Sequence, residues 1–141
     1  MRHLQKLHEK YSSKNLVILG FNCSDDRKIA LEFLGENGAA FPTILDSSEA
    51  AVKVGFRDYK GSGVPLNYII DPQGKIMGME VLTPEVGRNV EELIRQVKAY
   101  QHVQATGEVT PSGWQPGDIT LTPGPALVGK VWEVWKPKVA S

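Results

Sequence analysis

The 141-residue chain has one cysteine, Cys23, and no apolar stretch longer than residues 16–21. A lone cysteine cannot form an internal disulfide and says little about the redox compartment. The apolar stretch is far shorter than the roughly 20 residues that a membrane-spanning helix needs. The chain also lacks net charge, because 16 basic residues balance 16 acidic ones. No overall field would draw it to nucleic acid or anionic lipid, so we expect neither as a partner.

The first eleven residues, MRHLQKLHEKY, lack the apolar segment and the cleavage site of a signal peptide. Leu4, Leu7 and Tyr11 recur instead at helical spacing. As given, the sequence predicts a cytoplasmic protein, and a leader belonging to a longer reading frame is the alternative left open. His3 and His8 are five residues apart, so they point in different directions on a helix. We therefore predict no metal site and no cofactor.

Hydrophobic patterning predicts an α/β core with a mixed sheet. Residues 16–21 are expected to form a strand buried on both faces, and residues 41–46 a short extended piece. The turn signature Asp71-Pro72-Gln73-Gly74 predicts a hairpin between strands at 64–70 and 75–81. A first helix is expected at the N-terminus and a brief one at residues 47–55. Another is expected from the cap at 24–26 to about Asn37, with an apolar stripe of Ile29, Phe33 and Leu34. The last is expected to begin at Thr83-Pro84, and its shared apolar face consists of Val90, Leu93, Ile94 and Val97.

The composition changes after Gln101. The last forty residues hold five of the nine prolines, five of the fourteen glycines and all three tryptophans. We therefore predict a core at residues 1–101 and a C-terminal arm at 102–141, whose composition allows a further strand at 128–136. Trp114, Trp132 and Trp135 indicate an ordered arm, lying on the core or on a partner, because a free tail would leave aromatic surface exposed.

Several segments resemble the thioredoxin-like superfamily, in particular the alkyl hydroperoxide reductase/thiol-specific antioxidant and TlpA-like thiol–disulfide oxidoreductase families. They are L-Q-K-L-H-E-K-Y, L-V-I-L-G-F-N, F-P-T-I-L-D and G-V-P-L-N-Y-I-I-D-P-Q-G-K-I, within residues 4–97. The segment G-E-V-T-P-S-G-W-Q-P-G-D resembles the C-terminal arm of two-cysteine peroxiredoxins. The resemblance implies a thioredoxin-like sheet flanked by helices.

The departures from these families concern the redox cysteines. By the resemblance, the chain lacks the family's N-terminal β-α-β portion, with its CxxC or peroxidatic cysteine, and has Thr110 where the arm carries a resolving cysteine. We therefore expect a protein of oxidoreductase or peroxiredoxin descent that is weak or inactive in dithiol redox chemistry. Whether it is an enzyme stays open. The alternatives are a non-enzymatic binding or assembly module and an unrelated activity on the same fold.

Three sets of candidate site residues follow. Cys23 is the only possible catalytic thiol, and the alternative is a small, mostly buried residue at a strand end. Gly63, Val64 and Pro65 form a candidate substrate-binding segment, since Pro65 matches the family's cis-proline, before which the backbone pairs with an extended substrate. The alternative is that Pro65 serves only a turn. Trp114, Trp132 and Trp135 are candidate partner contacts, with anchoring of the arm on the core as the alternative.

The family's central strand would lie between the strands expected at 16–21 and 64–70. Without it, two strand edges would have unpaired backbone groups. We therefore predict a homodimer, possibly exchanging segments, in which residues 128–135 are the spare strand available for that position.

Overall fold

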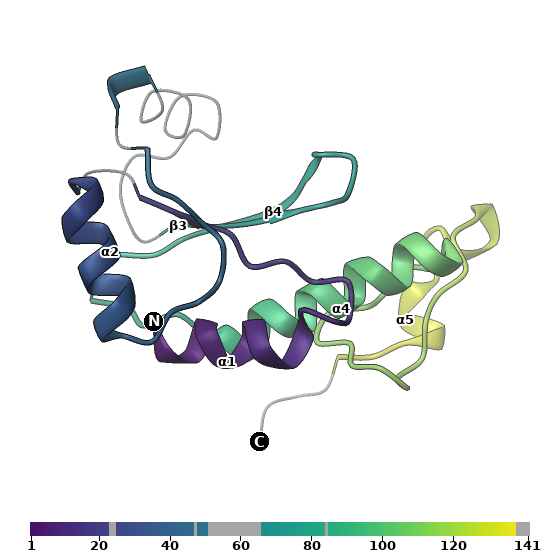
Figure 1. Cartoon of the computed structure of the whole chain (residues 1–141). Helices are drawn as coiled ribbons and strands as arrows, with labels where there is room; N and C mark the ends of the chain where they lie inside the picture. The colour runs from purple at the N-terminus through teal and green to yellow at the C-terminus, as the bar shows by residue number, and fades with distance from the viewer. Residues whose placement is uncertain (23–24, 47, 51–65, 84, 138–141) are drawn as a thin grey trace. The chain divides into compact units, whose positions relative to one another are not determined.

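The computed structural model describes the whole chain except residues 23–24, 47, 51–65, 84 and 138–141 (Figure 1). It contains two compact units, which are treated separately. The first comprises Met1–Leu66 and Val81–Gly87, and the second comprises Asn67–Glu80 and Arg88–Ser141. None of the helices in the described part combines the length and apolar character that crossing a bilayer requires.

Helix α1 (Arg2–Tyr11) opens the first unit, as its helical spacing predicts. Its inward side is anchored by Gln5, whose Oε1 accepts a hydrogen bond of 2.7 Å from the Ala40 N–H. The His8 ring meets the Phe41 ring edge to face, with centroids 6.4 Å apart. Phe41 is buried, so α1 packs against the segment that leads into β2.

The first unit contains a two-stranded parallel sheet of β1 (Gly20–Phe21) and β2 (Thr43–Ile44), with Gly20 paired to Thr43. Helix α2 (Arg27–Glu36) connects them, and the Asp26 side chain caps it by accepting from the Lys28 N–H. The extended piece expected at 41–46 and the capped helix ending near Asn37 are confirmed. The buried residue of α2 is Ala30, whereas the expected stripe residues Ile29 and Phe33 are about half exposed.

The prediction of a buried strand over residues 16–21 is wrong in length and in burial. Only Gly20 and Phe21 pair, and Val17 and Leu19 are 74% and 60% exposed. The physical reason is that a strand becomes buried on both faces only where other elements cover both faces of its sheet, and a two-residue strand forms little sheet to cover. In the described residues, β1 has the short β2 as its one pairing partner.

The predicted hairpin is confirmed as β3 (Leu66–Ile70) paired with β4 (Ile76–Val81). Asp71 organises the turn, because its Oδ1 accepts from the N–H groups of Gln73 and Lys75. Gly74 supplies the left-handed φ of 84° that closes the turn, and its N–H donates to the Asp71 carbonyl. The sequence signature and the structure agree here because the interaction is local.

Helix α4 (Val90–Thr106) begins later than predicted from Thr83 and Pro84. Its cap is Asn89, whose side chain accepts from the Glu92 N–H at 3.0 Å, and it ends at Gly107 in a left-handed conformation. Ile94 and Ala99 are its buried residues. Gly78 of β4 allows close packing in the same unit, since a Cβ there would lie 3.2 Å from the Tyr100 hydroxyl.

In the described residues after Gly107, the arm adds no strand at 128–136. That segment contains α5 (Val131–Val134), which follows a 3₁₀ turn, η2 (Pro125–Leu127). The backbone groups of a strand need a neighbouring strand as their hydrogen-bond partner. A single helical turn forms its backbone hydrogen bond within itself, here from the Trp135 N–H to the Val131 carbonyl. The arm's β-pairing is instead a single bridge between Val109 and Leu121. Helix α4 continues past Gln101 to Thr106, and a domain division at 101/102 stays a prediction.

Candidate functional site

The sequence-predicted residues divide into two groups. Cys23, Gly63, Val64 and Pro65 lie outside the described residues, so their predicted roles stay predictions. The three tryptophans of the arm are described, and all lie in the second unit. Trp114 and Trp135 line one hollow, whereas Trp132 does not. The candidate site that can be built from the structure is therefore the arm around Trp114.

Trp114 fixes the arm to α4. It is 4% exposed, and its Nε1 donates to the Asp118 carbonyl at 3.2 Å. Its indole lies against the His102 ring, with centroids 4.9 Å apart. Its own carbonyl accepts from Arg95 Nη1 at 3.2 Å. Of the two alternatives for Trp114, the structure supports the core-covering anchor.

A second connection between α4 and the arm was not found from the sequence. Glu108 Oε2 accepts from the Thr120 hydroxyl at 2.6 Å and lies 3.2 Å from His102 Nε2. The hydrogen bond from Thr120 is the main reason that the pKa of Glu108 is lowered, and His102 adds to it. The three residues are not at a recognisable motif spacing, so only the fold brings them together. The arrangement is a polar clamp and not a nucleophilic triad, because Thr120 bonds the carboxylate and not the imidazole.

Arg95 is held by Glu92 on the same helix. Its Nε and Nη2 donate to the two Glu92 oxygens at 2.7 and 2.6 Å. This bidentate bonding is the main cause that lowers the pKa of Glu92 from 4.5 to about 2, against the opposing effect of burial. The pair orients the guanidinium toward the Trp114 carbonyl.

The Glu92 carboxylate predicts an acid dependence of stability. Its folded pKa lies below its ordinary value, so its contribution is complete above about pH 5 and is lost as the pH falls toward 2. The side chain is 38% exposed, so solvent screening reduces the contribution to about 1 kcal/mol. We expect Glu92→Gln to lower the free energy of unfolding by about that much at pH 7. Its urea midpoint should also depend less on pH between pH 5 and 2 than that of wild type. Glu91→Gln, on the adjacent exposed residue, is the control, and equal slopes for both variants would contradict this assignment.

The hollow beside Trp114 has a volume of about 270 Å³. One side is the turn from Pro111 to Trp114 with Asp118 and Ile119, and the other is the segment from Val134 to Lys136. Ile119 and Val134 are both more than half exposed, so apolar surface faces this space. The hollow therefore combines aromatic and aliphatic surface with one carboxylate, from Asp118, and one ammonium group, from Lys136.

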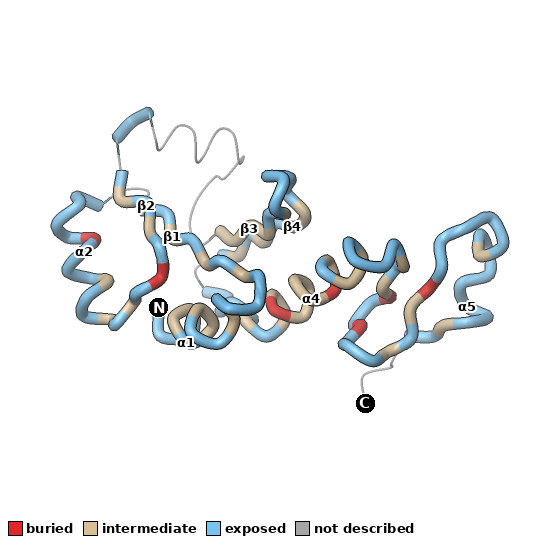
Figure 2. The backbone as a smooth tube through the Cα atoms, turned by 45° about the vertical axis from the view of Figure 1, so that its right-hand side comes forward, coloured by how far each residue is buried: buried red, intermediate tan, exposed pale blue. Residues whose placement is uncertain are grey.

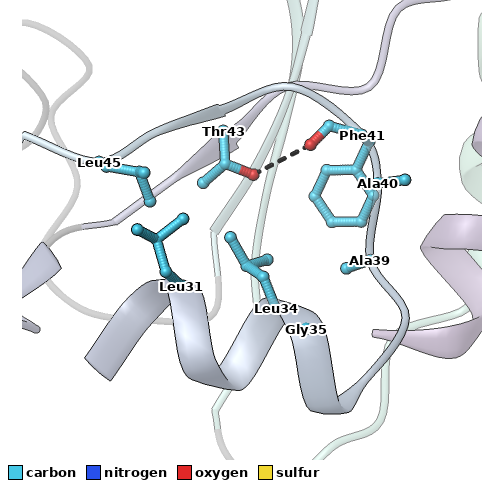
Figure 3. A pocket seen from close by; sticks show the side chains of 8 residues that line it. All are labelled: Leu31, Leu34, Gly35, Ala39, Ala40, Phe41, Thr43 and Leu45. Carbon is cyan, nitrogen blue, oxygen red and sulfur yellow. Dashed lines mark hydrogen bonds between the residues drawn. The ribbon is translucent and has the colours of Figure 1, made fainter. Parts of the chain in front are cut away.

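A second hollow, of about 340 Å³, lies in the first unit between α2 and the segment around β2 (Figure 3). Figure 3 shows Leu31 and Leu34 pointing from α2 toward Thr43 and Phe41. Its one side-chain polar group, the Thr43 hydroxyl, donates to the Phe41 carbonyl at 3.2 Å. No titratable side chain lines it, so it offers no acid–base group. Within the described part of the chain, no group of three His, Cys, Asp or Glu residues is placed to hold a metal ion.

Comparison with known proteins identifies the family. The model of the AhpC/TSA family matches residues 1–79, more than half of the chain. The chain belongs to the AhpC/TSA family. The model for the C-terminal domain of 1-Cys peroxiredoxin matches residues 99–136, which include the end of α4 and most of the arm. The resemblance expected from the sequence is thus confirmed for the core and, as a peroxiredoxin C-terminal domain, for the arm, where the matching model is that of 1-Cys and not of two-cysteine peroxiredoxins.

Several AhpC/TSA relatives are described as peroxide reductases. The selenocysteine-containing peroxiredoxin PrxU of Peptoclostridium acidaminophilum is 46% identical over 110 residues, covering 74% of this chain and 54% of its own. The human mitochondrial thioredoxin-dependent peroxide reductase is 47% identical over 76 residues, covering 50% and 30%. Alkyl hydroperoxide reductase C of Salmonella typhimurium is 41% identical over 76 residues, covering 53% and 41%. The chain thus spans about a third to a half of the length of these relatives.

Solved peroxiredoxin structures confirm the thioredoxin-like α/β fold. The reduced 2-Cys peroxiredoxin of Plasmodium vivax aligns with a TM-score of 0.69 at 24% identity, covering 84% of this chain and 65% of that one. The yeast mitochondrial 1-Cys peroxiredoxin aligns with a TM-score of 0.72 at 24% identity, covering 84% and 63%.

Proposed function

We propose that this AhpC/TSA chain is weak or inactive as a dithiol peroxidase by itself. The observation that carries the proposal is its cysteine count: the 141 residues contain Cys23 and no second thiol. The family's relatives include peroxide reductases, which makes peroxide the substrate class against which the chain should be tested.

The two steps of thiol-dependent peroxide reduction explain why the number of cysteines matters. A thiolate attacks one peroxide oxygen, forming an S–O bond while the O–O bond breaks and water or an alcohol leaves. The sulfenic acid then condenses with a second thiol, giving a disulfide and water. With one thiol, this second step requires a sulfur atom from another molecule. The resemblance places a resolving cysteine at the arm position of Thr110. The Thr110 hydroxyl has no sulfur atom and therefore cannot form a disulfide with the sulfenic acid.

Peroxide consumption tests the proposal directly. We expect wild type and Cys23→Ser to consume hydrogen peroxide at the same low rate with dithiothreitol as the reductant, because the resemblance places the family's redox cysteines in the N-terminal β-α-β portion and at the position of Thr110, and not at Cys23. Circular dichroism of both proteins provides the folding control. A wild-type rate well above that of Cys23→Ser would identify Cys23 as a peroxidatic thiol and contradict the proposal.

A second candidate function, an assembly or protein-binding module, is supported by exposed apolar residues of the arm. Trp132 is 63% exposed, and Val128 and Val134 beside it are also exposed. We propose a homodimer as the assembled form. Substrate pairing at Gly63, Val64 and Pro65, and a cytoplasmic location, also stay proposals.

A further inference from the structure

Helix α2 ends at the one Asn-Gly pair of the sequence, Asn37-Gly38. Each of the other four asparagines precedes a residue that has a side chain. The side-chain amide of an asparagine can be attacked by the backbone nitrogen of the next residue, and glycine leaves that nitrogen uncovered because it has no Cβ. Asn37 is therefore the asparagine whose side-chain amide is most open to this attack.

The fold places this pair at an exposed helix end. Asn37 is the C-cap of α2, and Gly38 follows it with a left-handed φ of 60°. Gly38 is exposed and Asn37 is half-buried, so water reaches both. Figure 2 shows α2 in the pale blue of exposed residues over most of its length, and Ala30 is its buried residue. Little burial therefore holds the last turn of α2 closed.

Two hydrogen bonds restrain the reacting atoms while this turn is closed. Asn37 Nδ2 donates to the Phe33 carbonyl at 2.9 Å, and the Gly38 N–H donates to the Gly35 carbonyl at 3.0 Å. The leaving group and the attacking nitrogen are thus both engaged within the helix end. Gly35 weakens the same turn, since glycine is among the poorest helix formers. Reaction between the two groups therefore requires the last turn to open.

We propose that Asn37 is a site of spontaneous deamidation whose rate is set by opening of the last turn of α2. When the turn opens, the Gly38 nitrogen attacks Asn37 Cγ, and a new C–N bond forms while the Cγ–Nδ2 bond breaks. The proton of the Gly38 N–H leaves with Nδ2 as ammonia, and a cyclic imide remains. Water then adds to one imide carbonyl and breaks its bond to the Gly38 nitrogen. The product is aspartate or isoaspartate, and no oxidant or reductant takes part.

The product changes the end of α2 in two ways. A carboxylate at position 37 has no N–H to donate to the Phe33 carbonyl, so that bond is lost. Its negative charge also lies at the C-terminus of a helix, where the macrodipole disfavours an anion. Isoaspartate adds a further change, because it routes the backbone through one additional carbon atom. Since α2 connects β1 to β2, deamidation should weaken the first unit.

Peptide mapping of the full chain, aged in mildly alkaline buffer, tests the site. Trypsin releases residues 29–53, which contain Asn37 as their one asparagine, and residues 61–75, which contain Asn67. We expect the change in mass from amide to acid to accumulate at Asn37 at least about tenfold faster than at Asn67, where the Tyr68 side chain hinders the attacking nitrogen. Chromatography against synthetic standards separates the aspartate and isoaspartate peptides. Equal rates at the two positions would overturn the proposed site.

A second measurement tests control by the helix end. Gly35→Ala strengthens α2 without crowding it, since the added Cβ meets no atom within 4 Å. We expect this variant to slow deamidation at Asn37 by up to about fivefold and to leave the rate at Asn67 unchanged. In urea, where the helix is absent, both proteins should react at Asn37 at one rate, at least about tenfold above that of folded wild type.

The protection that the fold gives to Asn37 is the part of the proposal most open to failure. Deamidation of the folded chain as fast as in urea would overturn the restraint by the two hydrogen bonds. A folded rate that Gly35→Ala leaves unchanged would overturn control by the opening of α2. Asn37→Asp, a permanent form of one product, should lower the urea midpoint, and an unchanged midpoint would overturn the predicted weakening of the first unit.

Discussion

Trp114→Ala is expected to lower the free energy of unfolding by about 3–5 kcal/mol, the range for truncating a large buried aromatic side chain. Trp114 is almost completely buried, so its loss leaves a cavity in the arm. The substitution also removes the Nε1 bond to the Asp118 carbonyl and the ring contact with His102. The bond from Arg95 goes to the Trp114 backbone carbonyl and should be retained in part.

Urea unfolding followed by circular dichroism measures this loss. The control is Phe33→Ala, an aromatic truncation at a half-exposed position, which should cost less than about 1.5 kcal/mol. Similar losses for both variants would show that Trp114 does not anchor the arm. A separate early transition in Trp114→Ala, with the remaining signal unchanged, would show that the anchoring is confined to the arm.

Gly20→Ala is expected to destabilise the β1–β2 pair by about 1–3 kcal/mol. A Cβ at Gly20 would lie 2.7 Å from Thr43 Oγ1 and 3.1 Å from both Thr43 Cγ2 and Phe41 Cε2. The β-branched Thr43 side chain is stiff at χ1, and its hydroxyl donates to the Phe41 carbonyl, so moving it costs that bond. Phe41 is buried and has little room to shift.

Gly35→Ala is the matched control, with an expected effect of opposite sign. Gly35 lies within α2, and an added Cβ meets no atom within 4 Å. Because alanine favours the helix over glycine, this variant should gain up to about 1 kcal/mol. Thermal unfolding should therefore rank Gly35→Ala above wild type and Gly20→Ala below it. The reverse order would contradict the close packing of β1 on β2.

The features that the sequence predicts well are those whose bonds are local. The hairpin follows from Asp71 and Gly74, which close their own turn, and the start of α2 follows from Asp26, which caps its own helix. The sequence predicts too early a start for α4 because Thr83, followed by Pro84, also has the pattern of a helix cap, whereas the structure uses Asn89.

The features that the sequence does not predict depend on distant partners. Residues 16–21 have the composition of a buried strand, but whether they pair and become buried depends on their neighbours in the sheet. Residues 128–136 have high strand propensity, yet four of them, Val131–Val134, form α5, since a strand needs a partner. The His102–Glu108–Thr120 clamp joins a helix to a loop twelve residues beyond Glu108, a contact that only the folded arm creates.

The central claim, that this AhpC/TSA chain runs no dithiol cycle by itself, is tested most directly by intact-mass measurement after one equivalent of hydrogen peroxide. At low protein concentration without added thiol, we predict unmodified chain or, at most, chain that has gained oxygen at its single cysteine, with no turnover beyond that. Cys23→Ser should then differ from wild type only in lacking any such oxygen. Rapid and complete conversion of wild type to a disulfide-linked pair of chains, in which the oxidised Cys23 of one copy condenses with the Cys23 thiol of another and releases water, would contradict the account if Cys23→Ser forms no such pair.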